Sequence, residues 1–339
     1  MFTNILVPLD GSARAERALP IAGRIARARG ASLLLVRVVA DLIDMGAYMA
    51  PSATLDQGLV DREMEDARAY LASLAQRYRD TGVKVATQVE MGTPTQTLLG
   101  LISANQVDGV IIGSHGRSGL ARWALGSVAQ AIVRHSTAPV LLLRQQGPAL
   151  DDDHDLRVGL LRVLIPLDGS ALAESALEPA LILGEIAANG DDFEAHVARV
   201  IPFLSAPDND SLREAARAEA QAYVDRIARQ VTATGNTHAH ITTSVITELD
   251  VADALARLTR SGELVTGATT SDGFDLLAMA THGRTGLPRL AMGSVTERVV
   301  SATTLPALII RPARIAAEAE QPAANVKASV ALNSWPALF

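Results

Sequence analysis

The chain has 339 residues and a formal net charge of −7, and its composition is 48% hydrophobic and 20% charged. This length allows two domains of ordinary size, while the negative charge argues against a non-specific nucleic-acid binder, which needs a basic surface. Cysteine is absent, which excludes disulfides, thiol catalysis and cysteine-based zinc sites. Neither an export signal nor an apolar run long enough to span a membrane is visible, so the expected compartment is the cytoplasm.

Short apolar stretches alternate with helical periodicity along the first half of the chain. Strands are expected at residues 5–7, 33–39, 83–89, 107–112 and 140–143. Between them, apolar residues recur every three or four positions, which predicts helices. The clearest is a long amphipathic helix with its apolar face at Val60, Met64, Ala67, Leu71, Leu74 and Tyr78. This alternation predicts a parallel sheet with right-handed crossovers and helices on both faces.

The second half of the chain repeats the first. The matched blocks are ILVPLDGS at 5–12 with VLIPLDGS at 163–170, SHGRSGL at 114–120 with THGRTGL at 281–287, GSV at 126–128 with GSV at 293–295, and Arg144 with Arg311. Blocks that recur in the same order indicate a duplication. We therefore expect one domain at residues 1–147, an acidic linker at 148–157 and a second domain at 158–313.

Residues 314–339 are rich in alanine and glutamate, and this composition is typical of a flexible tail. The tail ends with Trp335, Leu338 and Phe339, in a chain with only 3% aromatic residues. Docking of these side chains on a partner or a neighbouring subunit is the alternative that the sequence leaves open.

A glycine-rich loop is expected between the fourth strand and the following helix. Gly113 closes the strand, Gly116 follows it, and Gly126 precedes Ser127 at the predicted start of the helix. Glycine allows a backbone to approach an anion and to take a positive φ, and a helix N-terminus offers unpaired N–H groups and a partial positive charge. The pattern predicts a phosphate site formed by main-chain amides and the Ser127 hydroxyl; the alternative is a set of ordinary turn glycines.

Two common nucleotide motifs are absent. A Walker A loop needs Gly-Lys-Ser or Gly-Lys-Thr, whereas the chain has only two lysines, Lys84 and Lys327, in other contexts. The G-x-G-x-x-G fingerprint is missing as well. A conventional P-loop NTPase and an NAD dehydrogenase are therefore excluded.

Asp10 directly follows the first strand, between Pro8-Leu9 and Gly11-Ser12. In a doubly wound sheet, ligands bind outside the carboxyl ends of the strands at the point where the strand order reverses. The first and fourth strands should flank that point, which places Asp10 near the Gly113 loop. Its carboxylate could accept hydrogen bonds from a ribose or an adenine amine, or it could cap the next helix; we assign the cap to Ser12 and the ligand to Asp10.

The VPLDGS strand end and the G-2x-G-9x-G-Ser pattern resemble those of the universal stress protein family in its tandem-domain form. The resemblance covers residues 1–147 and 158–313. It implies two doubly wound, five-stranded parallel sheets of the nucleotide-binding α-hydrolase-like class, each with strand order 3-2-1-4-5. In the nucleotide-binding branch of the family it implies ATP in the crevice, with Mg²⁺ held chiefly by phosphates and water.

The resemblance also implies regulation of a stress response and pairing through the fifth strand. The fifth strands here are residues 140–143 and 307–310, which a tandem chain can pair within itself, and a homodimer is a further expectation. No contact with nucleic acid or with a membrane is expected.

Carried over by motif, the resemblance implies a set of nucleotide-binding residues. Asp10 would contact ribose or adenine, the backbone of Val38 would meet the adenine, and the glycine loop would hold the phosphates. Arg117 and Arg284 are added because guanidinium groups pair bidentately with phosphate oxygens. The set in the first domain is Pro8, Asp10, Val38, Gly113, Gly116, Arg117, Gly126, Ser127 and Val128. The set in the second domain is Asp168, Val200, Gly283, Arg284, Gly293, Ser294 and Val295.

The second domain departs from the pattern at Ala280, which replaces the first glycine of the loop. Its methyl group would face the place where phosphate approaches. A negative φ at Ala280 would leave binding intact, whereas a positive φ would strain the alanine. The sequence leaves open whether the second domain binds nucleotide.

Other polar residues are weaker candidates. His115 and His282 occupy matching positions and could touch phosphate or pack against the loop. His238 and His240 alternate on one strand, but two histidines without a carboxylate neighbour are weak evidence of a metal site. Three arginines are expected to be surface charges: Arg122, Arg134 and Arg289.

Three functions are compatible with these residues. The leading hypothesis is a regulatory ATP-binding module whose nucleotide changes domain pairing or partner affinity. The second is a slow ATPase or phosphoryl-transfer enzyme, although no residue is placed as a general base with a dedicated magnesium carboxylate. The third is an interaction protein that has lost its ligand, which the intact glycines of the first copy argue against.

Overall fold

The computed structural model describes residues 1–40, 57–114, 125–144, 160–203, 210–233, 235, 238–261, 273–282 and 292–312. The first repeat contributes strands β1 (Asn4–Pro8), β2 (Ser32–Val39), β3 (Lys84–Met91), β4 (Gly109–Gly113) and β5 (Val140–Leu143). The second repeat contributes β6 (Leu161–Pro166), β7 (Phe193–Pro202), β8 (Ala239–Glu248), β9 (Leu276–Ala280) and β10 (Ala307–Ile310).

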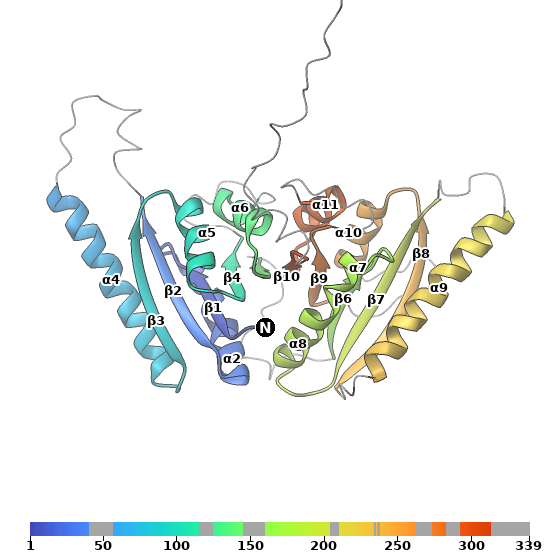
Figure 1. The fold of residues 1–339 in the computed structure, drawn as a ribbon, viewed down its shortest axis with the longest axis horizontal. Helices are drawn as coiled ribbons and strands as arrows, with labels where there is room; N and C mark the ends of the chain where they lie inside the picture. Colours follow the sequence, from blue (N-terminus) through green and yellow to red (C-terminus); the bar gives the residue numbers. More distant parts are fainter. Residues whose placement is uncertain are drawn as a thin grey trace, which may run out of the picture.

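These strands form one sheet in the order β3-β2-β1-β4-β5-β10-β9-β6-β7-β8 (Figure 1). Strand pairs within each repeat are parallel, and the predicted order 3-2-1-4-5 is confirmed in both. The repeats meet where β5 and β10 pair antiparallel, with Leu141 opposite Leu308. The expected pairing of the fifth strands within one chain is therefore confirmed, and it makes the two sheets continuous.

The strands begin and end close to their predicted positions, and β4 shows why one boundary moved. The stretch 107–112 is apolar, but β4 begins only at Gly109. Asp108 precedes it, and its carboxylate accepts hydrogen bonds from the backbone N–H groups of Thr3 and Asn4, both at 2.8 Å. The side chain thus joins the start of β4 to the start of β1, while the N–H of Val107 donates to the preceding helix at the Ile102 carbonyl.

Helices cover both faces of the sheet. One face carries α2 (Ala18–Arg29), α4 (Gln57–Arg79), α8 (Leu177–Ala187) and α9 (Asp210–Ala233). The other carries α5 (Pro94–Ala104), α6 (Ser127–His135), α10 (Val251–Ser261) and α11 (Ser294–Ala302). Short helices α1 (Ala13–Glu16) and α7 (Ala171–Glu174) precede α2 and α8. None of the described helices is both long and apolar enough to cross a membrane.

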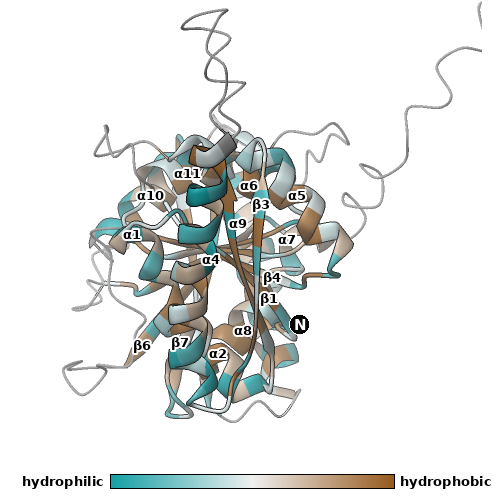
Figure 2. Ribbon diagram, turned by 90° about the vertical axis from the view of Figure 1, so that its left-hand side faces the viewer, coloured by the Kyte–Doolittle hydropathy of each residue, from teal (hydrophilic) through white to brown (hydrophobic). Residues whose placement is uncertain are grey.

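Two aliphatic cores fill the space between the sheet and these helix layers. Side chains alternate along a strand, so Ile5 and Val7 of β1 belong to one core and Leu6 belongs to the other. Each core contains residues of both repeats. The strands accordingly appear hydrophobic between helices whose outer surfaces carry hydrophilic residues (Figure 2).

A polar network lies on β6, β7 and β8 of the second repeat. Arg162 donates to the carboxylate of Glu194 at 2.7 Å, and the hydroxyl of Thr242 also donates to Glu194 at 2.7 Å. The ring of His196 lies between the hydroxyls of Thr242 and Ser244, with its Nδ1 3.7 Å from Glu194. His196, together with the donors Arg162 and Thr242, holds the pKa of Glu194 well below its usual range.

Arg134 lies at the seam between the repeats. Its guanidinium hydrogen-bonds to Glu297 of α11, and 32% of the side chain is exposed. The expectation that Arg134 is a surface charge is wrong, because the pairing of β5 with β10 brings α6 beside α11. The other two arginines in that expectation, Arg122 and Arg289, lie outside the described residues.

Candidate functional site

A cavity of about 250 Å³, here called cavity 1, lies at the carboxyl ends of β1, β2 and β4. Its lining contains every described residue that was predicted for the first domain: Pro8, Asp10, Val38, Gly113, Gly126, Ser127 and Val128. The remaining two, Gly116 and Arg117, lie outside the described residues. The fold therefore brings together residues that are far apart in the sequence, at the point between β1 and β4 where the strand order reverses.

The loop after β1 fixes the carboxylate of Asp10. Its Oδ1 accepts a hydrogen bond from the backbone N–H of Ser12 at 3.0 Å and another from the Ser12 hydroxyl at 2.6 Å. The hydroxyl oxygen of Ser12 in turn accepts from the N–H of Ala15 and caps α1. The assignment of the cap to Ser12 is thus confirmed, and Asp10 is held in the wall of cavity 1.

The opposite wall of cavity 1 is the start of α6. Gly126 is the N-cap and has no side chain to satisfy the first turn. Its own N–H donates to the carbonyl of Ser114 at 2.8 Å, so this amide is already used. The next three N–H groups, those of Ser127, Val128 and Ala129, have no acceptor within the helix. These amides make the end of α6 a place where an anion can bind.

Positive φ does not explain why both repeats have glycine at the helix start. Gly126 has a φ of −58°, and Gly293, its counterpart, also has a φ of −58°. Close packing is the reason at Gly293, because a Cβ there would lie 2.8 Å from the backbone oxygen of Thr281. The expectation of a positive φ is therefore wrong at both positions, while close approach of the backbone to an anion stays a prediction.

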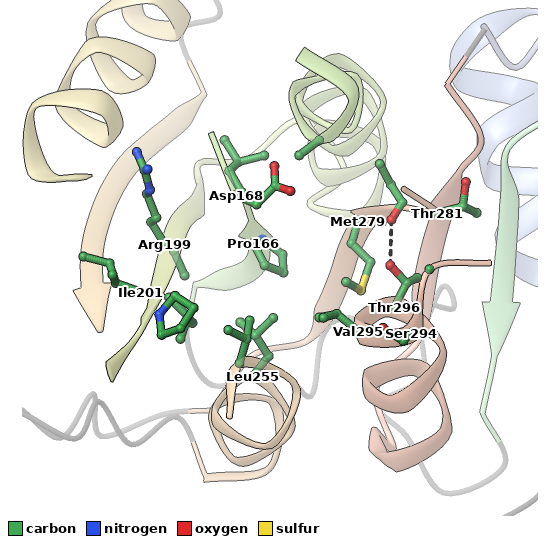
Figure 3. Close-up of a pocket in the computed structure, with 18 of the residues that line it drawn as sticks. Pro166, Asp168, Arg199, Ile201, Leu255, Met279, Thr281, Ser294, Val295 and Thr296 are labelled. Carbon is green, nitrogen blue, oxygen red and sulfur yellow. Dashed lines mark hydrogen bonds between the residues drawn. The ribbon is translucent and has the colours of Figure 1, made fainter. Parts of the chain in front are cut away.

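Cavity 2, of about 440 Å³, is the counterpart in the second repeat (Figure 3). Its lining includes all the described residues predicted for this domain: Asp168, Val200, Gly293, Ser294 and Val295. The loop residues Gly283 and Arg284 lie outside the described residues. Asp168 is held as Asp10 is, with its Oδ1 accepting from the N–H of Ser170 at 2.9 Å and from its hydroxyl at 2.6 Å.

Ala280 lines cavity 2 without backbone strain. The described non-glycine residues with a positive φ are Phe2, Gln106 and Asn189, so Ala280 adopts a conformation that suits alanine. The hydroxyl of Thr296 donates to the Ala280 carbonyl at 2.9 Å, as Figure 3 shows. Thr296 takes the position of Ala129 in the first repeat, so the two cavities differ at the junction of strand and helix.

The sequence analysis missed an arginine beside the strand position that was predicted to face adenine. Arg199 lines cavity 2, and its guanidinium lies over the ring of Tyr223 at 4.8 Å. The Tyr223 hydroxyl donates to Glu174 at 3.0 Å. Burial is the main factor that raises the pKa of Tyr223 above its usual range, and the charge of Glu174 adds to it.

The same arrangement occurs in the first repeat, where Arg37 lies over Tyr70 at 5.3 Å and the Tyr70 hydroxyl donates to Glu16 at 3.0 Å. Arg37 and Arg199 directly precede Val38 and Val200. Alignment of the two repeats would have revealed this pair.

The described histidine candidates differ in their surroundings. His282 is 9% exposed and its Nδ1 lies 3.0 Å from the Thr281 hydroxyl, which agrees with packing against the loop. His238 and His240 do have a carboxylate neighbour, because Asp192 lies 3.4 Å from each, so the expectation that they lack one is wrong. Among the described residues, however, no group of three or more possible ligands could hold a metal ion. The matching histidine, His115, lies outside them.

A doubly wound parallel sheet with a cavity at the reversal of strand order, beside a helix N-terminus, defines the α/β class that binds ligands at this edge. The universal stress protein family matches residues 1–144 and 160–311, and the chain belongs to this family. The two matches also agree with the duplication.

Relatives agree with this assignment. A universal stress protein of Mycolicibacterium smegmatis is 26% identical over 316 residues, which cover 91% of this chain and 97% of the relative. The crystal structure of a universal stress protein from Archaeoglobus fulgidus shares the fold, with a TM-score of 0.62 at 19% identity over 92% of this chain and 99% of that one. A universal stress protein solved in complex with cAMP is 25% identical, and the match covers 41% of this chain and 94% of that chain, with a TM-score of 0.30.

Proposed function

We propose that this chain is a nucleotide-binding regulator that holds ATP in cavity 1 and an adenine nucleotide in cavity 2. One observation carries the proposal: Asp10, Val38 and the start of α6 face a single cavity. In this arrangement the backbone of Val38 meets the adenine and the Asp10 carboxylate accepts from the ribose. The amides of Ser127 and Val128 hold the phosphates.

The charge distribution around cavity 1 supports phosphate at the start of α6. Asp10 is the one charged side chain in the described part of the lining. Helix α6 has no acidic residue in its first turn, and it carries Arg134 and His135 in its last, so nothing in that turn opposes the positive end of the helix dipole. Mg²⁺ would be bound chiefly through the phosphates and water.

The volume of cavity 1, about 250 Å³, lies just below the roughly 300–1,000 Å³ of common small-molecule sites. We therefore place only the base and ribose inside it. The base and ribose fit between β1, β2 and α5, and the phosphates extend along the start of α6.

Cavity 2 is the larger of the two, and its Ala280 is unstrained. These two observations support binding in the second repeat as well. Glu297 lies in the first turn of α11, which makes this helix start less attractive to phosphate than that of α6.

The test is to identify the nucleotide that is released when the purified protein is denatured, and then to measure thermal unfolding with ATP, ADP, AMP or cAMP, with and without Mg²⁺. A ligand at about 100 times its dissociation constant stabilises the folded state by about 2.7 kcal/mol. Stabilisation by an adenine nucleotide that falls in Asp10→Ala, and is lost when Asp168→Ala is added, supports the proposal. No bound nucleotide and no shift with any of the four would refute it.

Phosphate release distinguishes a binding module from a slow ATPase. Release above background that disappears in Asp10→Ala would identify an enzyme. Binding without release is the result that we expect.

A further inference from the structure

Two arginines cross the seam in opposite directions. Arg144 directly follows β5, and its guanidinium donates to the carbonyl of Val300 in the last turn of α11. Arg311 directly follows β10, and its Nη1 donates to the carbonyl of His135, the last residue of α6, at 3.3 Å. Each arginine therefore belongs to one repeat and binds the end of a helix in the other.

These contacts satisfy the ends of α6 and α11. The last carbonyls of a helix lack N–H donors within it, and a cation there also interacts favourably with the helix dipole. Arg311 is 7% exposed, and burial lowers the pKa of Arg144 to about 10, which leaves its guanidinium charged at neutral pH.

Each arginine is also connected to the cavity of its own repeat. Leu143, the residue before Arg144, accepts a hydrogen bond from the N–H of Ser114 at 2.8 Å, and the Ser114 carbonyl accepts from Gly126, the N-cap of α6, at 2.8 Å. Two backbone hydrogen bonds thus link the wall of cavity 1 to Arg144.

The second repeat contains the same path. Ile310, the residue before Arg311, accepts from Thr281 at 2.8 Å, and the Thr281 carbonyl accepts from Gly293, the N-cap of α11, at 2.7 Å. The two paths close into a ring. Arg144 connects cavity 1 to α11, which lines cavity 2. Arg311 connects cavity 2 to α6, which lines cavity 1.

We propose that Arg144 and Arg311 are positioning residues, each of which sets the helix that lines the cavity of the opposite repeat. Helices α6 and α11 each have nine residues. Because each helix is this short, it moves as a unit, and a shift of its last turn also shifts its first turn. The assignment of ligand to these helix starts rests on the proposed function. It follows that the affinity of each cavity depends on an arginine that belongs to the other repeat.

The seam offers a matched control. Arg134 of α6 also crosses it and hydrogen-bonds to Glu297 of α11, but this contact joins two side chains and does not engage a helix-end carbonyl. A general weakening of the seam would appear in Arg134→Gln as well, whereas the positioning effect would not.

The first measurement is backbone hydrogen exchange in the full chain without nucleotide. Arg144→Gln should speed exchange in α11 and leave α6 unchanged, and Arg311→Gln should do the reverse. Arg134→Gln should show no such preference. Faster exchange in the variant's own repeat, or equal changes in both, would overturn the proposal.

The second measurement is titration with ATP in chains that have one cavity blocked by Ser127→Glu or Ser294→Glu. Arg144→Gln should weaken binding to cavity 2 by roughly three- to tenfold, the effect of one lost hydrogen bond, with cavity 1 unchanged. Arg311→Gln should show the opposite pattern. Should Arg144→Gln fold poorly, Arg144→Lys retains the charge and should give a smaller loss in the same cavity.

The two measurements separate the two proposals. A parent chain that binds no ATP refutes the proposed function, while the exchange pattern tests the positioning across the seam without any ligand. Equal ATP affinities at the opposite cavity, with and without the arginine, would overturn the positioning role even where ATP binds.

Discussion

Substitution of Ser127 by glutamate should move stability and nucleotide binding in opposite directions. Ser127 is exposed at the first position of α6, after an N-cap glycine, in a first turn without an acidic residue. A carboxylate there interacts favourably with the positive end of the helix, by about 0.3–1 kcal/mol. The same carboxylate occupies the place where we put the phosphates. The folded chain should therefore become slightly more stable as its ligand is repelled.

Coulomb's law gives the size of the repulsion. Two unit charges about 5 Å apart interact by roughly 3 kcal/mol at an effective dielectric constant of about 20. Salt and the exposure of residue 127 reduce this value, so we expect ATP to bind roughly 10- to 100-fold more weakly, at about 1.4 kcal/mol for each factor of ten.

The assay is thermal unfolding of the variant and the parent chain, each with and without ATP. Without ligand, the melting temperature of Ser127→Glu should equal or exceed that of the parent. In chains with cavity 2 blocked by Ser294→Glu, ATP should raise the melting temperature less when Ser127→Glu is also present, at the same ATP concentration. Ser127→Gln is the control of similar size and no charge, and it should retain most of the affinity. Adenosine, which lacks phosphate, should bind to Ser127→Glu and to the parent alike.

ATP affinity of Ser127→Glu equal to that of the parent would refute the reasoning, since it would place the phosphates away from α6. Equal losses of ATP and adenosine would also refute it, because they would indicate damage to the cavity rather than charge repulsion.

Two further predictions concern stability. Gly293→Ala should destabilise the fold by about 1–3 kcal/mol, because its Cβ would lie 2.8 Å from a backbone oxygen. Gly100→Ala, at an exposed position inside α5 with open space around it, should stabilise the fold by about 0.5–1 kcal/mol. Denaturant unfolding measures both changes, and equal effects would contradict the packing argument. The depressed pKa of Glu194 means that its contribution is complete above its ordinary value of 4.5 and is lost as the pH falls toward the folded-state value. Glu194→Gln should therefore be less stable than the parent at pH 7 and lose less stability between about pH 5 and pH 3, and a parallel pH profile for the two chains would argue against the network.

Much of the architecture could be predicted because the repeats contain it twice. Strand positions and the amphipathic face of α4 follow from patterns that depend on local sequence and burial. The meeting of Asp10 with Gly113 followed from topology, since the carboxyl ends of neighbouring parallel strands lie at one edge of a sheet. The strand order and the role of Val38 came instead from the family resemblance.

The contacts across the seam could not be predicted in the same way. Arg144 and Arg311 were recognised as a matching pair, but their carbonyl partners belong to the opposite repeat and share no pattern with them in the sequence. Arg134 was expected to be a surface charge, and its sequence context does not reveal a partner. Only the antiparallel pairing of β5 with β10 places it opposite Glu297. The steric reason for Gly293 was missed because it depends on a distance to Thr281.

Because the two repeats belong to one chain, their residues can differ at matching positions. In a dimer of two identical chains, a substitution in one cavity also occurs in the other. A contact across the twofold axis likewise occurs twice, once from each chain. Here Arg134 meets Glu297, although their counterparts are Ser301 and Gln130. Likewise Ala280 and Thr296 stand where the first repeat has Gly113 and Ala129. The fixed one-to-one stoichiometry of a fused sheet thus lets the two cavities differ in their chemistry.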